Sequence, residues 1–139
     1  MPARDFYHAT VRTALVKAGW TITHDPFRLR LRRGKNLFVD LGAEQLIGAA
    51  LGTTQIAVEI KSFRSASDMK DLEEALGQFI LYRQLMVRYM PDRTLYLAIP
   101  ATIQKTVFEE EAGQVLLEDG LIRLVVFDPD LEEIIQWIP

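Results

Sequence analysis

The spacing of apolar residues along this 139-residue chain predicts two amphipathic helices. Over residues 5–18 apolar side chains recur every three or four positions, the period of a helix face, and Gly19 follows as a stop signal. The same spacing runs through residues 72–90. Ser65 is a candidate cap for this second helix, which is expected to end near Tyr89.

Short runs of β-branched and aromatic residues predict the strands. Apolar residues alternate with arginines over 27–32, and a turn at Gly34 with a second run over 37–44 completes a hairpin. Strands are also expected over 20–23, 55–62, 93–100 and 121–128, a partly helical segment over 102–119, and a short strand or last helical turn over 132–138. This order predicts a mixed α/β fold, with residues 1–139 as a single domain.

Composition matches an ordinary globular domain. Hydrophobic residues make up 49% of the chain and charged residues 25%. The absence of cysteine excludes a disulfide scaffold and a thiolate zinc site. The formal charge of −3 draws no nucleic acid to the chain as a whole, so anion affinity requires a local patch or a bound cation. No run approaches the ~18 apolar residues of a membrane span, and we expect a cytoplasmic protein without a membrane partner.

Two opposite charges interrupt the apolar strand IAVEIKSF, residues 56–63. Glu59 and Lys61 are two residues apart, so a strand points both side chains to the same face. Such a pair is either a structural ion pair or part of an active site. The strand by itself leaves both interpretations open.

Asp40 lies inside the apolar run LFVDLGAE and precedes Glu59 by 59 − 40 = 19 residues. If the two strands are neighbours, both carboxylates converge on one sheet surface with the backbone carbonyl of Ile60. These oxygen ligands suit Mg²⁺ or Mn²⁺. Lys61 would then stand beside the metal, where it positions the attacking water or neutralises charge on a phosphate. The alternative for Asp40 is a turn residue before Gly42.

The pattern Asp40…Glu59-Ile60-Lys61, on a helix–strand–strand–strand–helix–strand order, resembles the PD-(D/E)XK nuclease superfamily. The resemblance implies a restriction-endonuclease-like fold, a mixed sheet flanked by helices, and Mg²⁺-dependent hydrolysis of DNA. Val39 stands where that superfamily has a proline, but the proline touches no metal.

A second pair extends this resemblance along the long helix. Gln78 and Tyr82 are four residues apart and therefore share one helix face. Nucleases similar to the RecB nuclease domain carry a Q-x-x-x-Y signature there. The resemblance implies that Gln78 bonds to a water or to Lys61 and that Tyr82 contacts a phosphate. The alternative is a polar border on a helix that packs against the core.

Three further residues are additional candidates. Similar nucleases place an acidic residue or a histidine on the first helix, and Asp5 or His8 can take that position. Glu44 follows Asp40 on the same predicted strand face, where it is either an outer ligand or a solvated hairpin carboxylate.

The predicted hairpin carries a row of basic residues. Arg28, Arg30 and Arg32 alternate with apolar residues, and Arg33 and Lys35 follow in the turn. A row of guanidinium groups is typical of a phosphate clamp for DNA, with an affinity that falls steeply as salt is added. It is equally typical of a solvated face balanced by acidic runs elsewhere.

At finer grain the chain is similar to the XisH family, the excision controlling factors of the fdxN element. The stretches that carry the similarity are ARDFYHATVRTALVKAGWTITHDP, LFVDLGAE, IAVEIKSF, ALGQFILYRQL, RTLYLAIP and FDPDLEEIIQWI. The resemblance implies a role in programmed DNA-element excision with a XisI-family partner, either as a nuclease or as a non-catalytic module that binds DNA or a protein and controls a recombinase. The apolar IIQWI stretch is expected at an edge strand or an interface, including that of a homo-oligomer.

Overall fold

The structure is a computed structural model that describes residues 4–48 and 52–139. The stretch GAALGTT, residues 48–54, which separates two of the predicted strands, therefore lies partly outside the described residues. The helices of the protein are α1 (His8–Lys17), α2 (Asp68–Tyr89), α3 (Ala101–Ile103), the π-helical turn η1 (Gln104–Phe108) and α4 (Glu111–Glu118). Its strands are β1 (Thr21–His24), β2 (Phe27–Arg30), β3 (Asn36–Val39), β4 (Leu41–Gly48), β5 (Gly52–Ile60), β6 (Arg93–Pro100), β7 (Leu124–Asp128) and β8 (Glu133–Ile138).

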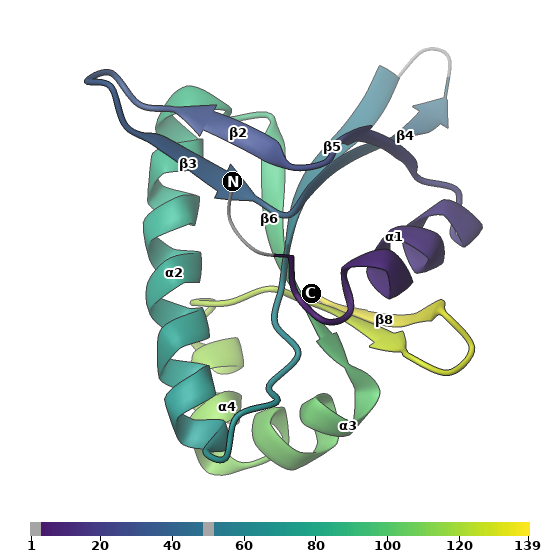
Figure 1. The fold of residues 1–139 in the computed structure, drawn as a ribbon, viewed down its shortest axis with the longest axis vertical. Coiled ribbons are helices and arrows are strands. Elements are labelled where there is room, and N and C mark those ends of the chain that lie inside the picture. The colour runs from purple at the N-terminus through teal and green to yellow at the C-terminus, as the bar shows by residue number, and fades with distance from the viewer. Residues whose placement is uncertain (1–3, 49–51) are drawn as a thin grey trace.

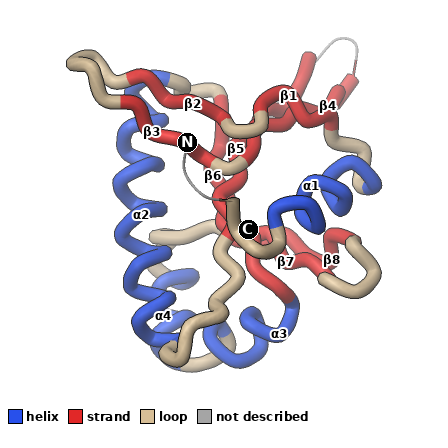
Figure 2. The backbone as a smooth tube through the Cα atoms, in the orientation of Figure 1, coloured by secondary structure: helices blue, strands red, loops and turns tan. Residues whose placement is uncertain are grey.

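Six strands form one mixed sheet in the order β1-β4-β5-β6-β7-β8. The central pairs β5–β6 and β6–β7 are parallel, and the outer pairs are antiparallel. Strands β2 and β3 form a separate two-stranded sheet (Figures 1 and 2). The prediction of a single-domain α/β fold with a mixed sheet flanked by helices is confirmed, and the IIQWI stretch forms the edge strand β8.

Each face of the large sheet has its own apolar core. On one face, Val11 and Leu15 of α1 pack against residues of β4, β5 and β7. On the other face, α2 packs with the β2–β3 hairpin, η1 and β6 around the fully buried Phe79. Because strand side chains alternate, β5 presents Ile56, Val58 and Ile60 to the α1 face and turns Glu59 toward α2.

The predicted second hairpin arm over 37–44 is wrong as a single strand. Val39 ends β3, where it pairs with Phe27, and Leu41 begins β4, where it pairs with Val58 of the large sheet. The chain therefore passes from one sheet to the other at Asp40. Both halves of the run are apolar because both sheets bury them, so the pattern alone carries no sign of this break.

Two helix starts also differ from the predictions. Helix α1 begins at His8 because Asp5 is held in the preceding turn, where its carboxylate accepts a hydrogen bond from the Tyr7 N–H at 2.9 Å. Helix α2 is capped by Ser67, whose Oγ accepts from the Lys70 N–H at 3.2 Å, and not by Ser65. Its predicted end at Tyr89 is confirmed. None of the described helices is long and apolar enough to cross a membrane.

Candidate functional site

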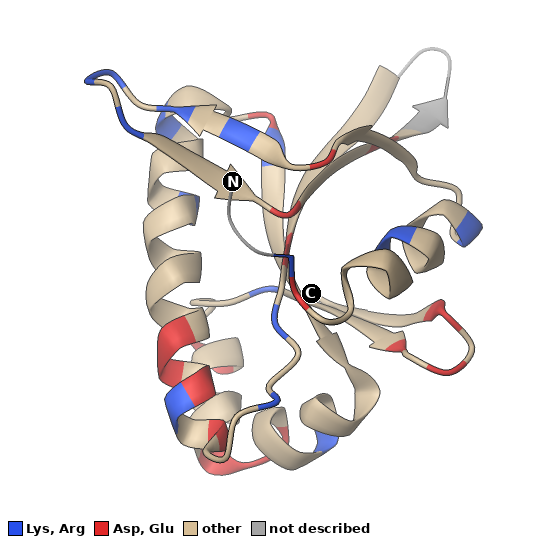
Figure 3. Cartoon of the chain, in the orientation of Figure 1, with Lys and Arg blue, Asp and Glu red and all other residues tan. Residues whose placement is uncertain are grey.

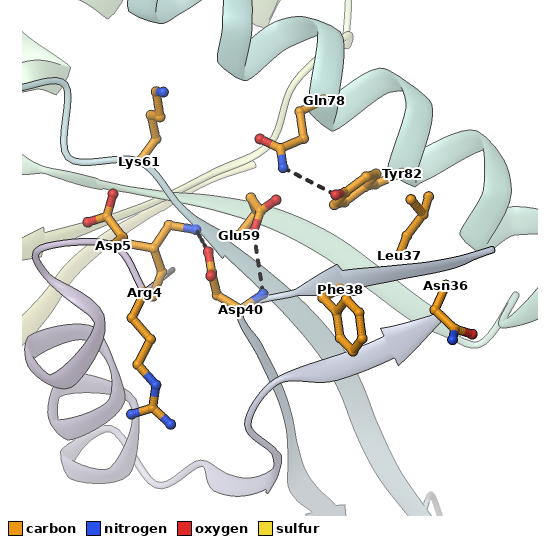
Figure 4. Close-up of a pocket in the computed structure, with 11 residues that line it drawn as sticks. Arg4, Asp5, Asn36, Leu37, Phe38, Asp40, Glu59, Lys61, Gln78 and Tyr82 are labelled. Atoms are coloured by element: carbon orange, nitrogen blue, oxygen red, sulfur yellow. Dashed lines mark hydrogen bonds between the residues drawn. The ribbon is translucent and has the colours of Figure 1, made fainter. Parts of the chain in front are cut away.

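A pocket of about 320 Å³ opens where the carboxyl end of β5 meets the β3–β4 junction. Four parts of the chain line it: the segment before α1, strand β3 with Asp40, the end of β5, and α2 (Figure 4). The structure brings together in this pocket the predicted residues Asp40, Glu59, Ile60, Lys61, Gln78 and Tyr82. The condition that the two strands be neighbours holds for β4 and β5, which pair from Leu41 and Val58 onward, although Asp40 itself lies in the link between β3 and β4.

Two side-chain hydrogen bonds hold the carboxylates in place. The backbone ladder between β4 and β5 ends at Leu41 opposite Val58. Beyond it, the Asp40 N–H donates to Glu59 Oε1 at 3.3 Å, and the Ile60 N–H donates to Asp40 Oδ2 at 2.7 Å (Figure 4). Each carboxylate therefore satisfies a backbone N–H that the ladder leaves free, which fixes both groups at the sheet end.

Glu59 is the buried member of this pair, with 6% of its surface exposed. Its second oxygen, Oε2, has no hydrogen-bond partner among the described residues. The pKa of Glu59 is raised from 4.5 to about 10, first by burial, then by the side chain and negative charge of Asp40 and by the charge of Asp5, whereas the Asp40 N–H that donates to Glu59 acts to lower it. A buried acceptor without a donor, beside two other carboxylates, is an environment that a cation would stabilise.

The oxygen atoms at this site are suitable ligands for a hard divalent cation, which prefers oxygen. No three acidic or histidine side chains cluster tightly enough, within the part of the chain that the structure describes, to enclose a metal by themselves. Mg²⁺ does not require such a cage, because it binds through one or two carboxylates and keeps several waters. Asp40, Glu59 and the Ile60 carbonyl would supply that smaller set.

Lys61 forms an ion pair with Glu74, which was not among the predicted site residues. Its Nζ donates to Oε2 of Glu74 on α2 at 3.2 Å, so the alternative of an ion pair between Glu59 and Lys61 is not what the structure shows. Glu74 lies four residues before Gln78 and eight before Tyr82, and this helical spacing was the available signal.

The predicted pair on α2 forms a hydrogen bond at the pocket wall. Gln78 Nε2 donates to the Tyr82 hydroxyl at 3.2 Å (Figure 4). Partial burial raises the pKa of the Tyr82 phenol, the Gln78 bond opposes this, and the charges of Glu59 and Asp40 raise it further. The phenol therefore stays neutral at physiological pH and keeps a proton that it can donate.

Of the three additional candidates, the structure brings only Asp5 to the pocket. Its Oδ2 accepts from the Ser62 N–H at 3.1 Å, just beyond Lys61. His8 instead lies with Nε2 2.7 Å from Asp25 Oδ1, in a separate cluster. Glu44 lies opposite Gln55, four residues along β5 from Glu59, and does not line the pocket.

The basic residues lie on the hairpin beside the pocket. Arg28 and Arg30 are exposed on β2, whereas Arg32, Arg33 and Lys35 are exposed in the loop (Figure 3). The strand therefore carries two of the three arginines predicted on it, because β2 ends at Arg30 and Arg32 lies in the loop. None of the five lines the pocket, but β3 of the same hairpin does, through Asn36, Leu37 and Phe38.

The similarity of this chain to known proteins extends over almost its whole length. A family model described as XisH protein matches residues 1–135. The crystal structure of an XisH family protein from Nostoc punctiforme PCC 73102 is 38% identical, with a TM-score of 0.85 over 97% of this chain and 100% of that one. The crystal structure of an fdxN element excision controlling factor protein from Anabaena variabilis is 40% identical, with a TM-score of 0.86 over 98% and 100%. No curated protein matches. On this similarity the chain belongs to the XisH family.

Proposed function

We propose that this protein is a metal-dependent phosphodiesterase with a restriction-endonuclease-like, PD-(D/E)XK fold, which acts on DNA during the excision of a DNA element. The observation that carries the proposal is the buried Oε2 of Glu59, which has no hydrogen-bond partner in the part of the chain that the structure describes and lies beside Asp40 in a pocket that also contains Lys61. A purely structural site would be expected to satisfy that oxygen with a donor from the chain.

Asp40, Glu59 and the Ile60 carbonyl are the groups that would hold Mg²⁺ or Mn²⁺. The bound cation would activate water for in-line attack at phosphorus and offset the charge that develops on the phosphate oxygens. The backbone N–H groups of Asp40 and Ile60 keep the two carboxylates oriented, so they need not reorganise when the substrate arrives.

Lys61 and the α2 pair would act on the substrate. The Lys61 ammonium would donate to the attacking water or to a phosphate oxygen as its charge grows. Release from Glu74 costs little, because an exposed ion pair is worth about 1 kcal/mol or less. The Tyr82 hydroxyl, oriented by Gln78, would donate to another phosphate oxygen.

The family supports the biological setting of this proposal. The relative from Anabaena variabilis is an fdxN element excision controlling factor protein. We propose that this chain acts in the same kind of reaction, with DNA as substrate and a XisI-family protein as partner.

A second candidate function is a non-catalytic module derived from a nuclease, which binds DNA or a protein and controls a recombinase. The net charge of −3 and the lack of a three-acid cluster in the described residues favour it. It predicts that Asp40, Glu59 and Lys61 can be replaced without loss of excision control.

Calorimetry with Mn²⁺, followed by cleavage assays on single-stranded, duplex and branched DNA, separates the two functions. Glu59→Gln and Asp40→Asn preserve side-chain shape and should lose both metal binding and cleavage. Glu44→Gln is the matched control, since Glu44 lies on the neighbouring strand outside the pocket. Cleavage by Glu59→Gln at the wild-type rate would overturn the phosphodiesterase proposal, as would the absence of metal binding by the wild type.

A further inference from the structure

We propose that the outer face of the β2–β3 hairpin binds a single strand of DNA and guides it into the pocket, with Phe38 stacking on an unpaired base and Arg28 and Arg30 holding phosphates. This inference rests on the proposed function, because it names the form of substrate that the same pocket accepts.

The strand register places the relevant side chains on one face. In an antiparallel pair, residues directly opposite each other point to the same side of the sheet. Arg28 lies opposite Phe38, and Arg30 lies opposite Asn36. Phe38 and Asn36 line the pocket, so the pocket wall continues directly into the two arginines.

The opposite face of the hairpin is committed to the core. Phe27, Leu29 and Val39 are buried there against α2. This packing fixes the hairpin on the molecule and leaves the arginine face exposed. The ion pairs formed among the described residues do not include Arg28 or Arg30, so both guanidinium groups are available for phosphate.

Phe38 differs from its neighbours in what it contacts. Leu37 and Val39 belong to the apolar cluster under α2, whereas Phe38 belongs to neither of the two clusters of the described residues. Its half-buried ring instead lines the pocket from the side of β3 opposite to Leu37 (Figure 4). A ring in that position is a platform for a nucleic-acid base, because every base has an apolar π face.

Stacking on Phe38 selects for an unpaired strand. In a duplex, both faces of an internal base are covered by neighbouring base pairs, so the ring has no face to contact. Arg28 and Arg30 are two residues apart on a strand, about 6.6 Å along its axis, a spacing of the same order as that of successive phosphates in an extended chain.

Basic side chains also lie on the other side of the carboxylates. Arg4 and Lys61 line the pocket across from Phe38 (Figure 4). Arg64 follows in the next loop, with its guanidinium carbon 3.6 Å from the centre of the Phe6 ring, which is 64% exposed. Cations on both sides suit a polyanion that crosses the pocket, although the chain as a whole is acidic.

Binding measured by fluorescence anisotropy in EDTA tests the inference without cleavage. A labelled single strand should bind at least tenfold more tightly than the duplex of the same sequence. Phe38→Ala should weaken single-strand binding about tenfold, and Phe38→Trp should restore it. Arg28→Ala with Arg30→Ala should weaken it and reduce the salt slope by about 1.4. Arg123→Ala, an exposed arginine away from the hairpin, is the control and should have no effect.

Equal or tighter binding of duplex would overturn the inference, as would unchanged single-strand binding by Phe38→Ala. Tighter binding of single-stranded RNA of the same sequence would overturn the assignment to DNA. The two proposals fail separately. Phe38-dependent binding of single-stranded DNA by a protein that binds no Mn²⁺ would retain the hairpin surface and reject the phosphodiesterase.

Discussion

Two carboxylate clusters contact the segment that precedes α1, one through Arg4 and the other through Asp5, and they differ in how their negative charge is balanced. Asp25 is surrounded by His8 at 2.7 Å, by Arg4 at 3.5 Å and by Arg12. Asp40 and Glu59 instead lie beside a third carboxylate, Asp5. Cations of the chain pair directly with Asp25, whereas the ion pairs among the described residues include neither Asp40 nor Glu59.

The acidities of the two clusters follow from this difference. Partial burial acts to raise the pKa of Asp25, but the hydrogen bond and charge of His8, with Arg12 and Arg4, outweigh it and lower the pKa. At Glu59 burial and the charge of Asp40 act together and raise the pKa to about 10. The Asp25 cluster links α1 to the β1–β2 turn and balances its own charge. The Glu59 cluster requires a proton or a cation from outside to balance its negative charge.

The largest expected effect is the pH dependence of stability without metal. Because folding raises the pKa of Glu59 from 4.5 to about 10, the folded state binds more protons than the unfolded state between those values. The free energy of unfolding should therefore fall as pH rises from 6 to 9, by up to about 1.4 kcal/mol per pH unit. Urea melts of wild type and Glu59→Gln in EDTA measure the difference. Parallel curves for the two proteins would contradict the raised pKa.

The next effect is stabilisation by metal. At a free Mn²⁺ concentration 100 times its Kd, the free energy of unfolding of the wild type should rise by about 2.7 kcal/mol. Binding should also release a proton from Glu59, so the calorimetric enthalpy should change with the ionisation enthalpy of the buffer. Asp40→Asn should lose both effects, and Asp25→Asn should keep both. Equal stabilisation of Asp40→Asn would place the metal elsewhere.

Replacement of Asp25, whose negative charge is balanced within the chain, should have a smaller effect that is confined to stability. Asp25→Asn removes a charge-assisted bond to the buried His8 and should lower the free energy of unfolding at pH 7 by about 1–2 kcal/mol. Because the pKa of Asp25 is lowered on folding, this contribution is present above the ordinary pKa and is lost as pH falls through the folded value. The difference between the two proteins should therefore vanish in acid. A difference that persists there would contradict the ionic origin of the stabilisation.

The smallest expected effect concerns Glu74, the exposed partner of Lys61. Glu74→Gln should change the free energy of unfolding by less than about 1 kcal/mol, while it frees the Lys61 ammonium and tightens single-stranded DNA binding about two- to fivefold. The gain should disappear at high salt. Glu73→Gln, the neighbouring exposed acid on α2, is the control. An equal gain in DNA affinity in that variant would show that the effect comes from net charge and not from the release of Lys61.

Much of the fold was predictable because its signals are local. The end of α2 at Tyr89 follows from helical spacing and a proline, and strand β6 matches its predicted range of 93–100. The grouping of Gln78 with Tyr82 on one wall was likewise predictable from their spacing of four. Each of these features depends on residues within a few positions of one another.

Other features depend on contacts between distant segments. A run of apolar residues has the same pattern whether it forms one strand or two, so the break at Asp40 follows only from the pairing of its halves with Phe27 and Val58. Whether Asp5 or His8 reaches the pocket also depends on distant contacts. Asp5 accepts a hydrogen bond from the Ser62 N–H beside the pocket, whereas His8 is held away from it by Asp25.

The order of residues was enough to predict which chemical groups are available and which of them share a strand or helix face, because backbone geometry repeats every two residues in a strand and nearly every four in a helix. The packing of distant segments was needed to show that Glu59 is buried, with an oxygen that has no hydrogen-bond partner among the described residues, while Asp25 is neutralised by His8, Arg4 and Arg12. Burial and charge balance are sums over atoms from segments far apart in the chain, and they exist only after those segments have packed together.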